Sequence, residues 1–212
     1  MKSKVVYVSK VDTKQYKIEF NRLFQEIKAE FIDNFSLAYR LVGSSKRNLV
    51  IRHHNKGFDL DYQIMIMKFK DGSNLKNPTN IKNAFFDFIQ NKMKSKYNVE
   101  NSTSAITLKR IVDSKIKVGF DIVIVKENIN SCEVLKRNND NVTYSFQPLK
   151  EYSDFKNNVK LIKNNYLWPE LRKKYLEDKI ENIKNNSNKK SYLILISSTK
   201  MVVEQNLEII RK

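Results

Sequence analysis

Residues 58–69 read FDLDYQIMIMKF, and this stretch decides the fold of the chain. Side chains alternate between the two faces of a β-strand. As a strand, the stretch carries Asp59, Asp61 and Gln63 on one face, and the other face is apolar: Phe58, Leu60, Tyr62, Ile64 and Ile66. Two carboxylates so close together on one strand face suit hard cations such as Mg²⁺, which prefer oxygen ligands.

A second apolar stretch repeats the pattern. Residues 117–125 read KVGFDIVIV and place Asp121 opposite the apolar side chains of Phe120, Ile122 and Ile124. Three carboxylates gathered on one sheet would repel one another unless a metal ion neutralised them. Taken singly, Asp59 could end a turn after Gly57, and Asp61 could be an ordinary solvent-facing residue. The metal hypothesis therefore rests on the three aspartates together.

The remaining periodicity predicts an α+β fold. Apolar residues recur at helical spacing over 13–33 and 77–96, and strands are expected over 37–42, 58–71, 105–112 and 117–125. A short helix is expected over 45–52. Asn77-Pro78 is typical of a helix start, because proline needs no hydrogen-bond acceptor in the first turn. The sequence predicts a mixed β-sheet flanked by helices.

The chain changes character after Gln147-Pro148. Helical stripes follow at about 152–162, from Trp168 to 183 and from Ser191 to about 211, with a polar loop over 184–190. We therefore expect two domains, a catalytic core over 1–147 and a helical lobe over 148–212. A cleft between two such lobes would be the natural place for a ligand.

The Gly43-Ser44-Ser45 sequence follows the first expected strand. Glycine lets a backbone approach a ligand closely, and N–H groups at the start of a helix attract phosphate. The turn could therefore bind the phosphates of a nucleotide. Lys46 and Arg47 could add positive charge, although a solvated surface role is the simpler interpretation of both.

Composition limits the classes of protein further. The 212 residues are 41% hydrophobic and 30% charged, and no apolar run is long enough to span a bilayer. The N-terminal apolar run is also too short for a signal peptide. Cys132 is the single cysteine, so no internal disulfide can form and a cytoplasmic location is expected.

The net charge of +17 favours polyanionic partners such as RNA, DNA or nucleotides. It argues against polycationic substrates. The chain also holds 25 asparagines, which is typical of an A+T-rich genome whose codon usage can supply lysine as well. Nucleic acid is therefore a favoured partner, without being required by the charge.

The ordered set Gly43, Ser44, Asp59, Asp61 and Asp121 resembles that of the DNA polymerase β-like nucleotidyltransferase superfamily, over roughly residues 36–125. The loop from 45 to 58 is slightly longer than is usual there. The resemblance implies that Asp59 and Asp61 hold two Mg²⁺ (or Mn²⁺) ions and that Asp121 holds the ion that activates the acceptor. It also implies that Gly43, Ser44 and Ser45 bind the triphosphate of an NTP. Neither His53 nor His54 is needed for such chemistry.

A weaker resemblance links the C-terminal part to cyclic GMP-AMP synthase-like and oligoadenylate synthase-like enzymes. It rests on VKLIK, residues 159–163, and on KKSYLILI, residues 189–196. It implies that Lys163, or else Lys173, holds phosphate and that Ser191 and Tyr192 cradle phosphate and base. Here an additional helix separates the two segments. Tyr192 could equally be a core residue and Lys163 an exposed one.

These observations predict a metal-dependent nucleotidyltransferase that transfers NMP from an NTP such as ATP to an acceptor hydroxyl. The acceptor could be RNA such as a tRNA end, a second nucleotide, a small molecule or a protein. The alternative is a catalytically silent nucleic-acid-binding module with the same fold. No membrane partner is expected, and the sequence leaves the oligomeric state open. A candidate RNA-binding face comprises Arg172, Lys173, Lys174, Lys184, Lys189 and Lys190.

Overall fold

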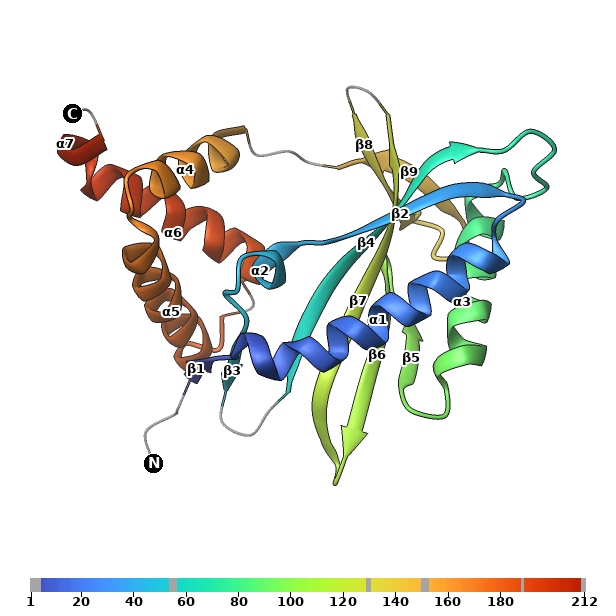
Figure 1. The fold of residues 1–212 in the computed structure, drawn as a ribbon, viewed down its shortest axis with the longest axis horizontal. Helices are drawn as coiled ribbons and strands as arrows, with labels where there is room; N and C mark the ends of the chain where they lie inside the picture. Colours follow the sequence, from blue (N-terminus) through green and yellow to red (C-terminus); the bar gives the residue numbers. More distant parts are fainter. Residues whose placement is uncertain (1–4, 54–56, 129–130, 150–152, 188, 211–212) are drawn as a thin grey trace. The chain divides into compact units, whose positions relative to one another are not determined.

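The computed structural model describes residues 5–53, 57–128, 131–149, 153–187 and 189–210 (Figure 1). The chain forms two compact units, one of residues 8–149 and one of residues 1–7 together with 150–212. Residues 1–7, which the sequence assigned to the core, are thus grouped with the C-terminal part. The assignment of catalysis to a core over 1–147 and of a separate role to a helical lobe over 148–212 stays a prediction.

The unit of residues 8–149 contains one mixed sheet of seven strands. Strand order is β2-β4-β7-β6-β5, and β8 pairs with both β7 and β9. The central pair β4 and β7 is parallel, and every other pair in this sheet is antiparallel. The elements of this unit are α1 (Lys10–Glu30), β2 (Phe35–Leu41), α2 (Gly43–Lys46), β3 (Ile51–His53), β4 (Phe58–Phe69), α3 (Pro78–Met93), β5 (Asn98–Asn101), β6 (Ala105–Val112), β7 (Lys115–Glu127), β8 (Cys132–Arg137) and β9 (Tyr144–Pro148).

Helices α1 and α3 lie on the same face of this sheet and bury the apolar side chains of β4, β6 and β7 (Figure 1). Phe20 of α1 stacks on Tyr62 of β4 with ring centroids 3.5 Å apart. Phe31 of α1 stacks on Phe85 of α3 at 4.4 Å. The apolar face predicted for residues 58–66 is therefore the core face, and the predicted mixed α+β fold is confirmed.

Local signals set several boundaries. Asn77 caps α3, because its side-chain oxygen accepts from the backbone N–H groups of Thr79 and Asn80. Asp113 and Ser114 both have positive φ, as a two-residue hairpin turn between antiparallel strands requires. The helix predicted over 45–52 is wrong. Helix α2 ends at Lys46, Asn48 adopts the left-handed conformation, and residues 51–53 form β3.

The second unit contains β1 (Val5–Tyr7), α4 (Ser153–Asn164), α5 (Trp168–Lys184), α6 (Ser191–Gln205) and α7 (Leu207–Ile210). The three helical stripes predicted from the sequence are present. The last stripe is shorter than predicted, because α6 ends at Gln205 and a separate turn, α7, follows. Within the described ranges, none of the helices combines the length and the apolar character needed to cross a bilayer.

Candidate active site

The three predicted aspartates lie on the sheet face opposite the core. Strands β4 and β7 run parallel with Asp61 directly beside Asp121, and Asp59 beside Gly119. Residues at neighbouring positions of paired strands share a face. The side chains of Asp59, Asp61 and Asp121 therefore project from one small area of the sheet, two strands wide.

Gly119 makes room for the first of these carboxylates. A Cβ atom at this position would lie 2.2 Å from Oδ1 of Asp59, far closer than any non-bonded contact allows. The Asp59 side chain therefore rests on the backbone of Gly119, and any larger residue there would displace it.

The turn before α2 packs against the second carboxylate. Gly43 has φ +61, and a Cβ atom there would lie 2.6 Å from Oδ2 of Asp61. The Val42 N–H also donates to the carbonyl of Asp61 (2.9 Å). The predicted turn and the Asp61 carboxylate are thus brought together, and only glycine satisfies both the close approach and the backbone conformation.

The serines of this turn differ in their surroundings. The Ser45 hydroxyl is buried, donates to the carbonyl of Asp59 (3.4 Å) and accepts from the N–H of Asp61 (3.3 Å). Ser45 therefore fastens α2 to β4. Ser44 is half-buried, and its carbonyl accepts from the backbone N–H groups of Arg47 and Leu49. The Arg47 guanidinium donates to the Gly43 carbonyl (3.1 Å), and Lys46 is exposed.

Burial, with repulsion from its neighbours, perturbs the central carboxylate. Burial raises the pKa of Asp61 to about 7, and the charges of Asp121 and Asp59 add to the effect. Asp121 accepts a hydrogen bond from the Thr107 hydroxyl (2.7 Å) on the neighbouring strand β6. Thr107 could not be singled out from the sequence, because its position beside Asp121 follows from the pairing of β6 with β7.

The donor chemistry of the three aspartates fits a divalent cation. All three offer carboxylate oxygens, the ligands that Mg²⁺ and Mn²⁺ prefer, and a cation would relieve the repulsion that raises the pKa of Asp61. The three side chains make different contacts. Asp59 leans over Gly119, Asp61 leans toward Gly43, and Asp121 is held by Thr107. In the described part of the chain, no three Asp, Glu, His or Cys side chains gather closely enough to hold a metal ion.

In the second unit, Ser191 and Tyr192 begin α6. The Lys179 ammonium donates to the Ser191 hydroxyl (2.9 Å), and the Tyr192 ring meets Phe155 of α4 edge-on at 5.4 Å. Lys163 is eight residues after Phe155 on α4, so it lies about 12 Å along the helix from the residue that contacts Tyr192. Its ammonium lies 5.8 Å from the Trp168 ring. The structure thus pairs Ser191 with Lys179, a lysine that the sequence analysis missed.

The six residues of the candidate RNA-binding face are not equivalent. The Arg172 guanidinium lies over the Tyr7 ring at 3.9 Å, and Lys174 forms an ion pair with Asp178 (2.8 Å). The other four are exposed, and in the described residues no ion pair or side-chain hydrogen bond is seen for their ammonium groups: Lys173, Lys184, Lys189 and Lys190. Of the two histidines, His53 is half-buried in β3, and His54 lies outside the described residues.

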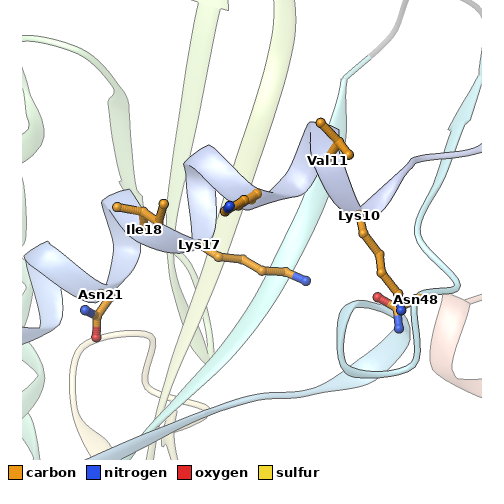
Figure 2. Close-up of a pocket in the computed structure, with 7 residues that line it drawn as sticks. Lys10, Val11, Lys17, Ile18, Asn21 and Asn48 are labelled. Carbon is orange, nitrogen blue, oxygen red and sulfur yellow. The ribbon is translucent and has the colours of Figure 1, made fainter.

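A groove of about 470 Å³ runs along the N-terminal half of α1 (Figure 2). Figure 2 shows Lys10 extending from α1 toward Asn48, with Lys17 further along the helix. The lining comprises Lys10, Val11, Lys14, Lys17, Ile18, Asn21 and Asn48. None of the three aspartates lines this groove, so it is separate from the carboxylate face.

No protein-family model and no curated protein matches the sequence. Solved structures do match the fold. A mutant of the dinucleotide cyclase DncV of Vibrio cholerae, in complex with ATP and GTP, matches with a TM-score of 0.56 and 9% identity, over 96% of this chain and 60% of that one. The 3′-deoxy GTP bound form of Vibrio cholerae DncV matches with a TM-score of 0.54 and 10% identity, over 82% of this chain and 49% of that one.

The GTP bound form of the same protein matches with a TM-score of 0.52, 10% identity and the same coverage of 82% and 49%. This chain spans about half the length of these last two structures. At such low identity the likeness shows the fold. The fold that both resemblances imply is confirmed.

Proposed function

We propose that this chain, which has a nucleotidyltransferase fold, transfers NMP from an NTP to an acceptor hydroxyl and releases pyrophosphate. The observation that carries the proposal is the register of β4 and β7. It puts Asp61 beside Asp121, and it puts Asp59, two residues earlier on β4, beside Gly119. These residues lie on the sheet face that the helices α1 and α3 leave open. The Gly43 turn packs directly against the Asp61 carboxylate.

Asp59, Asp61 and Asp121 would hold Mg²⁺ or Mn²⁺. When bound, such ions neutralise the triphosphate and lower the pKa of an attacking hydroxyl. The protein's own part is positioning, which dominates catalysis in phosphoryl transfer. Thr107 holds the Asp121 carboxylate in place through its hydrogen bond, and Ser45 fixes the distance between the Gly43 turn and β4.

The Gly43-Ser44 turn is the proposed site for the triphosphate. Its backbone comes within contact distance of the Asp61 side chain, so a phosphate placed there would lie beside the carboxylates. We assign Ser45 a structural role within this site, because its hydroxyl already bonds to the backbone of β4. In the helical unit, Ser191 and Tyr192 remain proposed contacts of the nucleotide. Lys179 joins them, and Lys163 is kept as a separate phosphate contact.

The similar solved structures bind GTP, 3′-deoxy GTP, or ATP and GTP, which supports an NTP as substrate. For the acceptor we propose a nucleotide or an RNA end such as that of tRNA, because of the net charge of +17. RNA affinity should then fall with salt at a log–log slope of about −0.7 for each phosphate neutralised. Reversing the charge of Lys173, Lys184 and Lys189 should weaken RNA binding and spare NTP binding.

The decisive experiment incubates the protein with each α-labelled NTP in Mg²⁺ or Mn²⁺, with nucleotides or total RNA as acceptors. The label should pass to an acceptor, and Asp121→Asn should abolish the transfer while the circular dichroism spectrum stays unchanged. Transfer by the Asp121→Asn variant at the wild-type rate would show that the three aspartates are not the catalytic site.

The net charge of +17 favours one second candidate, a nucleic-acid-binding module that has kept the fold without activity. The same assay separates the two. RNA binding without transfer from any NTP, in either metal, would select the silent module.

A further inference from the structure

Beyond the aspartates, the open face of the sheet continues onto β6 and β5. Strand pairing extends the row of Asp61 and Asp121 through Thr107 to Glu100. The neighbouring row runs from Asp59 through Gly119 to Lys109 and then Asn98. Directly paired residues of a sheet share a face. Lys109 and Glu100 therefore lie on the carboxylate face, at the Asp121 side of the site.

Lys109 places a positive charge next to the carboxylates on this face. Its ammonium donates to both oxygens of Glu100, at 2.8 and 3.0 Å. The hydrogen bond that Lys109 donates to Glu100 raises the pKa of Lys109, and the charges of Glu100, Asp121 and Asp59 add to that effect. The strand register places Lys109 across Gly119 from Asp59, and its ammonium stays charged at neutral pH.

Gly119 separates Asp59 from Lys109 in this row and carries no side chain. The nearest atoms to the Cβ position of Gly119 belong to the Asp59 carboxylate and to the Leu108 carbonyl (3.5 Å). Because Gly119 puts no side chain between Asp59 and Lys109, a substrate group that contacts the Asp59 carboxylate would lie beside Lys109. An anionic group there would compete with Glu100 for the Lys109 ammonium, because both are acceptors for the same donor.

We propose that Lys109 binds a phosphate group of the acceptor substrate and that Glu100 competes for the same ammonium until the acceptor arrives. This inference rests on the proposed nucleotidyl transfer and deepens it. It makes the acceptor a phosphorylated compound, such as a nucleotide or an RNA end, rather than an uncharged alcohol. Lys109 is a binding residue in this scheme and takes no part in the bond that forms at the α-phosphate.

Opposite changes at the two residues provide the test. Lys109→Met removes the cation and keeps most of its length, and Glu100→Gln removes the competing charge. The matched controls are Lys92→Met and Glu26→Gln, because Lys92 and Glu26 form an exposed ion pair (3.1 Å) between α3 and α1, on the other face of the sheet.

Binding is measured by calorimetry with AMP and GMP as acceptor probes, and with adenosine and guanosine as their uncharged counterparts. A non-hydrolysable NTP analogue in Mg²⁺ first saturates the donor position. Lys109→Met should raise the Kd of the monophosphates about five- to tenfold and leave that of the nucleosides unchanged. Glu100→Gln should lower the monophosphate Kd about two- to fivefold, as expected for release from an exposed ion pair.

Three results would overturn the proposal. One is a monophosphate Kd that Lys92→Met raises as much as Lys109→Met does. That result would indicate a non-specific effect of the net positive charge. Another is weaker binding in Glu100→Gln, and the third is the lack of saturable binding by wild type up to about 1 mM. Failure of the NTP analogue itself to bind would refute the proposed function separately, and the monophosphate titration would still test Lys109.

Discussion

Replacing Asp61 by asparagine removes the carboxylate that is most strongly perturbed by its surroundings. In the folded protein burial raises its pKa from 3.8 to about 7, with Asp121 and Asp59 adding to the effect. One pKa unit corresponds to about 1.4 kcal/mol, so the full difference corresponds to about 4 kcal/mol. The folded state binds this proton more tightly than the unfolded chain. Protonation of Asp61 therefore contributes to the free energy of unfolding in full below pH 3.8, and this contribution is lost as the pH rises through about 7.

At pH 8 the folded wild-type protein holds an ionised, buried Asp61 beside two other carboxylates, which lowers its free energy of unfolding. Asparagine carries no charge and avoids this loss. We expect Asp61→Asn to be more stable than wild type by about 2 to 4 kcal/mol at pH 8, without metal. At pH 5 the wild-type Asp61 is protonated in the folded state. The advantage of the variant should therefore shrink by about 2 to 3 kcal/mol between pH 8 and pH 5.

The assay is urea denaturation of both proteins in EDTA at the two pH values. Other titrating groups are common to both proteins, so their contributions cancel in the comparison. Asp59→Asn is the control, because Asp59 is exposed and its loss should change stability by less than about 1 kcal/mol. A stability difference between wild type and Asp61→Asn that is the same at pH 8 and pH 5 would refute the reasoning.

Three further predictions concern other residues. Burial and the Arg137 charge lower the pKa of Lys82 to about 8, and its ammonium has no hydrogen-bond partner among the described residues. Lys82→Met should therefore stabilise the protein at pH 7 by up to about 3 kcal/mol, and this gain should vanish as the pH rises from 8 to 10.5. A variant that is less stable than wild type in urea at pH 7 would contradict this. Gly119→Ala should lower the free energy of unfolding by about 1 to 3 kcal/mol and reduce nucleotidyl transfer at least about tenfold, because the new methyl group displaces the Asp59 carboxylate. Transfer at the wild-type rate by a folded variant would disprove that placement. An NTP with Mg²⁺ or Mn²⁺ should raise the melting temperature more than the same NTP with EDTA, and equal shifts would count against metal binding at the aspartates.

The sequence alone determined the architecture around β4. Alternation over residues 58–66 fixed which face would be buried, because a strand that covers a core on one side repeats every two residues. The same period put Asp59 and Asp61 on the open face. Helix α3 began at its predicted cap, and the β6–β7 turn lay at the predicted Asp113-Ser114, because these signals act within a few residues.

Short or irregular elements were not predictable in the same way. Residues 45–52 were expected to be helical, yet the left-handed Asn48 follows α2 and residues 51–53 are extended. Strands β5, β8 and β9 were missed, because strands of only a few residues depend on their partners more than on their own pattern.

Only the tertiary structure decided what surrounds the aspartates. The parallel register of β4 and β7 put Gly119 beneath Asp59 and Asp121 beside Asp61, and the antiparallel register of β6 brought Thr107 and Lys109 to the same face. Sequence patterns report which face a residue occupies, because that depends on the local repeat. They do not report its neighbour on the next strand, because register is set by the packing of the whole sheet against α1 and α3.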